Sequence, residues 1–325
     1  KFFSATHEEI ATLATTDIYF IRTYEILNAL GLGDTPVVAE VFPRRDGIMA
    51  GTPEVVNLFS GKNVELWALP EGTPFKAKST VMRIIGPYNQ FGAFETVLLG
   101  ILAQASGWAT AAREVKEAAG DKLVYCFAAR HVHPAVAPVM ERAALVGGAD
   151  GASCILGAKL YGREPVGTVP HAVFLIIGDT VEAARAYHRL MPPDAPRTIL
   201  IDTFKDEAEE TLRVAEALGK DLFGVRLDTP SERGGVTPEL VREVRYRLDL
   251  AGYTHVRILC SGGLYPEKVR ELAAAGADAF GVGSYISSAP PIDMTLDLKQ
   301  VRGTPVAKRG RLPGPIDNPQ LQRFL

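Results

Sequence analysis

Cysteine is scarce in this chain of 325 residues, which has only Cys126, Cys154 and Cys260 and no CxxC spacing. An odd number of unpaired cysteines argues against both a disulfide framework and a structural zinc site, and it fits a reducing compartment. No apolar run approaches the roughly 18 residues that indicate a membrane-spanning helix, and the N-terminus shows no signal-peptide pattern. We therefore expect a cytoplasmic protein with no membrane partner.

An excess of positive charge is also missing. The chain has 35 Lys and Arg against 38 Asp and Glu, a formal net charge of −3. This balance excludes a generic binder of nucleic acid or of anionic membranes, because phosphate backbones require many cations. It leaves room for a small anionic substrate, which needs only a few local cations. Hydrophobic residues make up 47% of the chain, which is enough to bury a sizeable core.

Residues 1–110 predict a small α+β domain. An amphipathic helix is expected over Asp17–Leu30 and a buried helix over Phe91–Ala105. Short strands bounded by Gly and Pro are expected between these helices, at Val37–Phe42, Val64–Leu69 and Thr80–Ile85. In the tail, residues 291–325, the alternating pattern from Thr295 to Lys299 predicts a hairpin. A hairpin has no place in a barrel, so we expect it to return to the N-terminal domain.

Residues 111–290 show a repeated pattern of strand, loop and helix. The candidate strands are Leu123–Phe127, Gly151–Ser153, Glu164–Thr168, Thr198–Asp202, Phe223–Asp228, Val256–Ser261 and Ala277–Val282. They are continuous apolar runs, which indicates a parallel sheet covered on both faces. Their number favours a closed or nearly closed (β/α) barrel, and a doubly wound open sheet is the alternative.

Polar residues follow almost every candidate strand. They are Arg130, His131, Ser153, His171, Asp202, Asp228, the run Ser261–Gly263 and the run Gly281–Gly283. Each one taken alone is commonly a helix N-cap. Together they predict an active site, because barrel enzymes carry theirs at the carboxyl ends of the strands.

Chemistry can be assigned to some of these positions from residue type alone. Gly262, Gly263, Gly281 and Gly283 follow the last two strands, where barrel loops commonly bind phosphate through backbone N–H groups. Tight turns would require the same glycines. Asp202 and Asp228 suit ribose hydroxyls, magnesium or developing positive charge, and a structural pairing of an Asp with Arg226 is the alternative. Arg130 suits a carboxylate or phosphate.

The pair His131 and His133 is the opening of the pattern found in metal-dependent barrel hydrolases. That pattern also needs later histidines at strand ends. His188 lies within a predicted helix and His255 precedes its strand, so both fall on the wrong face of the barrel. A metal-dependent hydrolase is therefore disfavoured.

Several motifs, taken in order, resemble the nicotinate phosphoribosyltransferase family. The stretch from Asp150 to His171 is similar to the family signature that passes through Gly-Ala-Lys-Leu-Tyr-Gly to Gly-Thr-Val-Pro-His. The other landmarks are Thr16-Asp17-Ile18-Tyr19, Phe127-Ala-Ala-Arg130, Gly224-Val-Arg226-Leu-Asp228, Ser261-Gly-Gly, Phe280-Gly-Val-Gly283 and Ala307-Lys-Arg-Gly310. The resemblance covers nearly the whole chain.

The resemblance implies that nicotinate and phosphoribosyl pyrophosphate are converted into nicotinate mononucleotide and pyrophosphate, with Mg²⁺ and with ATP hydrolysis. It implies an irregular, incomplete (β/α) barrel with an N-terminal α+β domain that the C-terminal tail completes. It also implies a head-to-tail homodimer with shared active sites, alone or within a higher oligomer.

The resemblance further implies a role for each matching residue. Tyr19, from the partner subunit, and Phe127 would sandwich the pyridine ring, while Arg130 and Ser153 would bind its carboxylate. Lys159 and Arg226 would bind phosphate or pyrophosphate oxygens, beside Thr168 in the substrate site. Asp202 and Asp228 would hold ribose hydroxyls and stabilise the positively charged sugar. Gly262, Gly263, Gly281 and Gly283 would bind the 5-phosphate. His171 would be phosphorylated by ATP, and magnesium would be bound through pyrophosphate, with or without Asp202 or Asp228.

Other activities stay open at this point. His131 replaces a second arginine that many relatives carry, and the loop after Asp228 departs from the family pattern. A quinolinate phosphoribosyltransferase is the main alternative, although a dicarboxylate needs more cations. A nicotinamide enzyme is disfavoured because Ser153 stands where an aspartate would be expected. A non-catalytic nucleotide sensor is disfavoured because Asp202, Asp228 and His171 are all retained.

Overall fold

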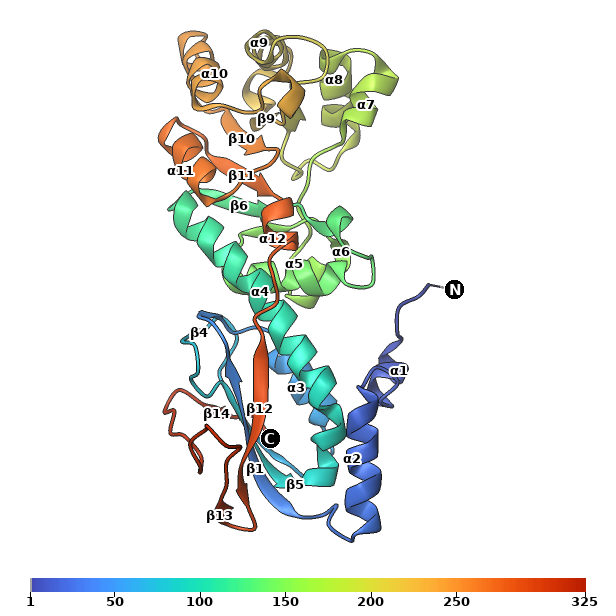
Figure 1. Ribbon diagram of the computed structural model, residues 1–325. Helices are drawn as coiled ribbons and strands as arrows, with labels where there is room; N and C mark the ends of the chain where they lie inside the picture. The colour runs from blue at the N-terminus through green and yellow to red at the C-terminus, as the bar shows by residue number, and fades with distance from the viewer. Residues whose placement is uncertain (1) are drawn as a thin grey trace. The chain divides into compact units, whose positions relative to one another are not determined.

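The computed structural model describes residues 2–325, which form two compact units (Figure 1). One unit contains the residues up to Thr110 together with Ala289–Leu325, and the other contains Ala111–Ser288. The division falls inside one long helix, α4 (Glu95–Ala119). In the described residues, no helix is both long enough and apolar enough to cross a membrane.

The first unit is built on an antiparallel sheet with strand order β13-β12-β1-β5-β3-β14. Its strands are β1 (Pro36–Pro43), β3 (Glu65–Ala68), β5 (Met82–Pro87), β12 (Met294–Val301), β13 (Thr304–Pro305) and β14 (Gln322–Arg323). Its helices include α1 (His7–Ala11), α2 (Ile18–Ala29) and α3 (Thr52–Phe59), and β2 (Gly47–Ile48) pairs with β4 (Pro74–Phe75). Strand β12 pairs with β1 over most of its length, so the tail belongs to this sheet.

One face of this sheet carries the core of the first unit. Val41, Leu66 and Ile84 come from three different strands and are fully buried together with Phe59 of α3. Burial of such side chains stabilises the unit by removing apolar surface from water. Glu40, which is also buried, accepts a hydrogen bond from the guanidinium of Arg83, the hydroxyl of Thr80 and the backbone N–H of Ile316. The tail is thus tied to the sheet by a buried carboxylate as well as by strand pairing.

The second unit is built on a parallel sheet with strand order β7-β6-β11-β10-β9-β8. Its strands are β6 (Leu123–Cys126), β7 (Gly151–Ala152), β8 (Thr198–Leu200), β9 (Gly224–Leu227), β10 (Arg257–Ser261) and β11 (Ala279–Val282). All five pairings between these strands are parallel, which confirms the arrangement predicted from their continuous apolar runs. In residues 2–325 no pairing joins β7 to β8, an arrangement consistent with an α/β barrel that is not closed.

Helices alternate with the strands of this unit. They are α5 (Ala137–Gly147), α6 (Ile155–Leu160), α7 (His171–Ile177), α8 (Thr180–Leu190), α9 (Glu207–Leu218), α10 (Pro238–Leu250), α11 (Pro266–Ala274) and α12 (Ser284–Ser287). Of these, α6, α7 and α12 are additional to the helices expected from the sequence. The strand predicted at Glu164–Thr168 was wrong, because this segment is an irregular loop. Pro165 removes a backbone donor that a ladder would need, and Gly167 weakens any strand. The predicted helix at Phe91–Ala105 was also misplaced, since α4 begins at Glu95 and continues to Ala119.

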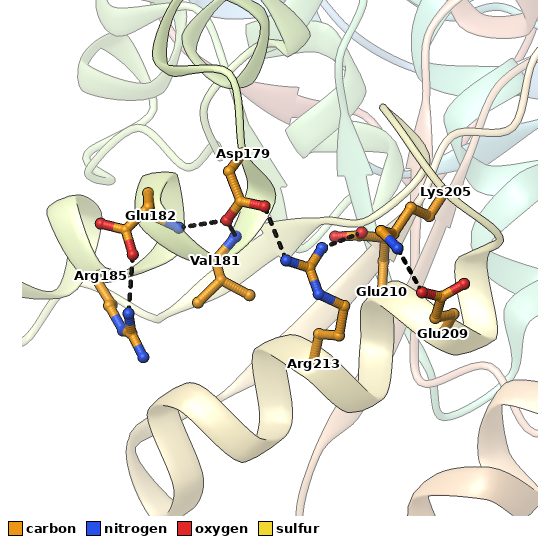
Figure 2. Close-up of polar contacts among 8 residues, drawn as sticks. All are labelled: Asp179, Val181, Glu182, Arg185, Lys205, Glu209, Glu210 and Arg213. Atoms are coloured by element: carbon orange, nitrogen blue, oxygen red, sulfur yellow. Dashed lines mark hydrogen bonds and ion pairs between the residues drawn. The ribbon is translucent and has the colours of Figure 1, made fainter.

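Helices α8 and α9 are joined by an arginine that contacts two carboxylates (Figure 2). Asp179 is the N-cap of α8 and accepts hydrogen bonds from the backbone N–H groups of Val181 and Glu182. Arg213 of α9 donates to Asp179 at 2.8 Å and to Glu210 at 2.5 Å. Because the side chain of Glu210 is fully buried, Arg213 supplies the charge that makes its burial tolerable.

Replacing Arg213 with Met should lower the free energy of unfolding by about 3 kcal/mol, because it leaves the buried carboxylate of Glu210 without its cation. The matched control is Arg185→Met, which breaks the exposed pair between Arg185 and Glu182 in the same region (Figure 2). That change should cost less than about 1 kcal/mol. Urea denaturation of both variants measures the difference. Equal decreases in the free energy of unfolding would contradict the view that Arg213 compensates the buried charge of Glu210.

Candidate active site

A pocket of about 520 Å³ lies at the carboxyl ends of the parallel strands. This is within the range of small-molecule sites. Its walls come from the carboxyl ends of β6, β7, β8, β9, β10 and β11 or the segments that follow them, together with the loop before α7. The lining residues are Phe127, Ala129, Arg130, His131, Ser153, Gly167–His171, Leu200, Arg226, Asp228, Ser261–Gly263, Gly281, Gly283 and Ser284. Most of the residues singled out in the sequence are therefore brought together here.

Arg226 is the most connected side chain of the pocket. Its guanidinium donates to the hydroxyl of Ser261 and to the hydroxyl of Thr168, both at 2.9 Å. It lies 3.4 Å from a carboxylate oxygen of Asp228 and 5.3 Å from the centre of the Phe127 ring. These contacts fix the planar fork in one orientation, so its position does not have to be organised when an anion binds.

Asp228 lies in the same network. Its Oδ1 accepts a hydrogen bond of 2.7 Å from the hydroxyl of Ser261, while Oδ2 faces Arg226. The side chain stays about one-quarter exposed, so its oxygens remain accessible from the pocket. The structural pairing of an aspartate with Arg226, considered from sequence, is therefore real, and it leaves this carboxylate in the pocket wall.

His171 and Asp202 form a second polar pair. Nε2 of His171, the first residue of α7, lies 2.9 Å from Oδ2 of Asp202. Burial raises the pKa of the Asp202 carboxyl above its ordinary value, and the nearby His171 only partly offsets that effect. Oδ1 of Asp202 is buried and has no hydrogen-bond partner within residues 2–325. His171 lines the pocket, whereas Asp202 lies behind it as its hydrogen-bond partner.

The four glycines of the pocket serve two different needs. Gly262 and Gly263 have φ values of +93° and +62°, a conformation that favours glycine. A Cβ added to Gly281 would lie 2.6 Å from the Phe127 ring, and one added to Gly283 would lie 2.7 Å from the His131 ring. Gly262 and Gly263 thus have the turn conformation considered from sequence. Close packing against Phe127 and His131 explains why Gly281 and Gly283 lack a side chain.

Glu141 is a site-organising residue that sequence reasoning missed. It lies on α5, is fully buried, and its Oε1 accepts hydrogen bonds from the N–H groups of Ala128 and Ala129 and from the hydroxyl of Ser153. Its Oε2 accepts one from the N–H of Cys154. The one available signal was a single acidic residue among the apolar residues of α5.

The hydrogen bond to Glu141 changes the expected role of Ser153. A serine hydroxyl has one hydrogen, and here that hydrogen is directed to Oε1 at 2.9 Å. Ser153 therefore presents lone pairs to the pocket, so the expected donation to a substrate carboxylate does not fit this arrangement.

Three other expected site residues lie in different surroundings. Arg130 is exposed and lines the pocket. Lys159 is exposed on α6 and is not part of the pocket wall. Tyr19 is half exposed on α2 of the first unit, where its ring packs on Phe20 at 4.1 Å. The pocket wall of the second unit thus contains one of these three.

No metal cluster is evident in the described part of the chain, and two of its three thiols are buried. Residues 2–325 contain no group of three or more His, Cys, Asp or Glu side chains arranged to hold a metal ion. Nδ1 of His131 lies 3.2 Å from the Ser287 hydroxyl, and burial lowers the pKa of this histidine. Burial raises the pKa of the Cys126 and Cys260 thiols, which disfavours their thiolate forms.

Comparison with known proteins identifies the relatives of this chain. The profile of the quinolinate phosphoribosyl transferase N-terminal domain matches residues 17–106, and that of the C-terminal domain matches residues 108–297. The crystal structure of nicotinate-nucleotide pyrophosphorylase from Pyrococcus furiosus is 46% identical, with a TM-score of 0.92 over 97% of this chain and 82% of that chain.

Curated relatives of two kinds also match. Nicotinate phosphoribosyltransferase pncB2 of Mycobacterium tuberculosis is 32% identical over 74% of this chain, which spans only 52% of that relative. The carboxylating nicotinate-nucleotide pyrophosphorylase of Homo sapiens is 28% identical over 86% of this chain and 88% of its own length.

The family inferred from the motifs was therefore wrong. Both domain profiles are those of quinolinate phosphoribosyl transferase, and the structure with 46% identity is a nicotinate-nucleotide pyrophosphorylase. The predictions of a nicotinate phosphoribosyltransferase, of ATP as a cofactor and of phosphorylation at His171 fall with it. The motifs misled because the chain resembles both kinds of protein.

The contact between Gly281 and Phe127 predicts a steric effect on the pocket. Gly281→Ala should cost about 1–3 kcal/mol of stability, because the new methyl group would displace the Phe127 ring. Gly167→Ala is the matched control, since Gly167 also lines the pocket and an added Cβ meets nothing within 4 Å. It should change stability by less than about 0.5 kcal/mol in denaturant titrations. Equal stability of the two variants would contradict the close approach.

Proposed function

This chain belongs to the quinolinate phosphoribosyl transferase family, and we propose that it transfers the phosphoribosyl group of phosphoribosyl pyrophosphate to quinolinate. The products are nicotinate mononucleotide, pyrophosphate and carbon dioxide, a step of NAD biosynthesis. The observation that carries the proposal is the Arg226 network, which fixes a cation, a carboxylate and two hydroxyls at the carboxyl ends of the strands matched by the C-terminal profile. The reaction does not require ATP.

The phosphoribosyl side of the site is proposed to lie along β9, β10 and β11. Gly262 and Gly263 can turn backbone N–H groups toward the 5-phosphate. Gly281 and Gly283, which also line the pocket, would let Phe127 and His131 pack closely beside this phosphate site. Arg226 offers a preorganised guanidinium for phosphate or pyrophosphate oxygens. Thr168, which it contacts, would complete this wall.

Asp228 is proposed to stabilise the sugar as pyrophosphate leaves. The bond between the anomeric carbon and pyrophosphate breaks with positive charge developing on the ribose, and a nearby carboxylate lowers the energy of that charge. His171, held by Asp202, would donate a hydrogen bond to pyrophosphate.

Asp228 fits a magnesium ion that arrives with pyrophosphate, because its oxygens are accessible in the pocket wall. Asp202 lies behind His171 and is only 2% exposed, so Asp228 would be the carboxylate that holds the ion. Magnesium commonly combines one or two carboxylates with substrate phosphates. When bound, it would neutralise the charge of the leaving pyrophosphate.

The pyridine side is proposed to lie along β6 and β7. Phe127 would stack on the ring, and the exposed guanidinium of Arg130 would bind the carboxylate that is retained. The carboxylate next to the ring nitrogen leaves as carbon dioxide. Its electron pair stays on the ring carbon, stabilised by the adjacent positive nitrogen, and then takes a proton.

Tyr19 is proposed to enter this site from a second copy of the chain. Helix α2 and its C-cap Leu30 expose four large apolar side chains, each more than half accessible: Ile18, Tyr19, Ile26 and Leu30. Such a row of apolar side chains is typical of an interface. A homodimer with shared sites would cover this row.

The shared-site proposal can be tested by complementation between Tyr19→Ala and Asp228→Asn, two variants that each lose activity. In mixed dimers with shared sites, one site of each hybrid is intact, so unfolding and refolding an equal mixture should restore about a quarter of wild-type activity. Refolding each variant alone is the control. If the mixture stays inactive although hybrids form, Tyr19 does not serve a partner's site.

The reaction is tested with purified protein, Mg²⁺, phosphoribosyl pyrophosphate and either quinolinate, nicotinate or nicotinamide, without ATP. Quinolinate should give nicotinate mononucleotide, and chelating the metal should abolish turnover. Arg226→Lys should lower kcat/KM about 100-fold because the planar fork is lost. Arg257→Lys, which alters an exposed ion pair, should keep kcat/KM within about twofold of the wild-type value. Mononucleotide from nicotinate but not from quinolinate would overturn the proposal.

A further inference from the structure

The carboxylate of Glu141 lies between two loops of the pocket. Its side chain is fully buried and accepts four hydrogen bonds, three from backbone N–H groups and one from a hydroxyl. An ionised carboxylate is an acceptor only, so it can satisfy four converging donors at once. A neutral side chain of the same shape could not satisfy them all.

The four donors come from two strand ends. Ala128 and Ala129 follow β6, and Ser153 and Cys154 follow β7. Their immediate neighbours Phe127 and Arg130 line the pocket, as do Ala129 and Ser153 themselves. The donors include no residue of the segments after β9, β10 and β11. The hydrogen bonds that Glu141 accepts thus come from one side of the pocket, formed by the loops after β6 and β7.

We infer that Glu141 is a positioning residue that holds the pyridine-binding side of the pocket and not its phosphate-binding side. The inference rests on the proposed function, which places the pyridine ring against Phe127 and Arg130. Glu141 does not line the pocket, so it acts through the two loops whose donors it gathers. Binding groups must be held to within a fraction of an ångström, and a buried charge with four partners provides that constraint.

Glu141 also sets the chemistry that Ser153 offers. Because the serine hydrogen points to Glu141, Ser153 presents acceptor lone pairs toward the ligand. Recognition of the retained carboxylate then depends on Arg130, and Ser153 disfavours a second carboxylate at its own position. Glu141 therefore determines which part of the pocket accepts negative charge.

The experiment compares Glu141→Gln with Glu40→Gln. Glu40 is the matched control because it is an equally buried carboxylate, held by Arg83, Thr80 and Ile316 in the first unit. In Glu141→Gln the amide NH₂ group opposes an N–H donor, and the loops shift. KM for quinolinate should rise about 10- to 100-fold, while KM for phosphoribosyl pyrophosphate should stay within about threefold. Glu40→Gln should lower the melting temperature and leave both KM values unchanged.

Glu141→Asp provides the second variant. It keeps the charge but is one methylene shorter, so its KM for quinolinate should fall between those of the wild type and Glu141→Gln. If Glu141→Gln does not fold, the aspartate variant is used for the same comparison. An equal change in both KM values, no change in either, or the same pattern in Glu40→Gln would overturn the inference.

Calorimetric titration separates this inference from the proposed reaction. The Kd values of quinolinate and of phosphoribosyl pyrophosphate can be measured whether or not turnover occurs. In Glu141→Gln the Kd for quinolinate should rise, while the Kd for phosphoribosyl pyrophosphate should stay within about threefold of the wild-type value. If the wild-type protein binds both compounds without turnover, the proposed reaction fails while the role of Glu141 is still decided by the Kd values. Wild-type protein that does not bind quinolinate would overturn both proposals.

Discussion

The guanidinium of Arg226 is the constraint on which the rest of the pocket depends. It projects from β9 and joins Ser261 of β10, Thr168 of the loop before α7 and Asp228 beyond its own strand. Only the carboxyl ends of parallel strands bring these segments together, so the pocket exists because the sheet is parallel. The guanidinium also lies 5.3 Å from the centre of the Phe127 ring, so Arg226 contacts the segment that follows β6 as well.

A second charged centre of opposite sign complements it. Glu141 gathers the loops after β6 and β7, as Arg226 gathers those around β9 and β10. Both charged groups are hydrogen-bonded mainly to hydroxyl or peptide groups. Burial of a charge costs free energy unless its hydrogen bonds are all formed, so each group depends on its partners being in place. The two halves of the pocket are thus held by different charged residues, and the contact between Arg226 and Phe127 connects them.

Local features of the sequence predicted much of the fold. Continuous apolar runs revealed six strands of the parallel sheet, because such strands are buried on both faces. The strand predicted at Glu164–Thr168 does not form, because Pro165 and Gly167 both disfavour a strand. The polar residues after the strands were predicted to converge, and the pocket contains most of them. The role of Glu141 could not be predicted, since its donors come from residues 128–129 and 153–154 and depend on how α5 packs.

The sequence motifs predicted where the pocket lies, but they did not predict which reaction takes place there. Arg226, Asp228 and the glycine loops can serve any enzyme that binds a phosphoribosyl group, so they do not distinguish one pyridine acid from another. The hydrogen bond from Ser153 to Glu141 could not be predicted, because Glu141 lies on a different element, α5. The two domain profiles, which match residues 17–106 and 108–297, show the quinolinate phosphoribosyl transferase family instead.

The stoichiometry of the reaction tests the central claim most directly. Quinolinate labelled in the carboxyl group next to the ring nitrogen would be incubated with phosphoribosyl pyrophosphate and Mg²⁺, and labelled carbon dioxide and pyrophosphate would be counted together. The account predicts that one carbon dioxide is released for each pyrophosphate, and that none is released when phosphoribosyl pyrophosphate is omitted. Pyrophosphate formed without labelled carbon dioxide would contradict it.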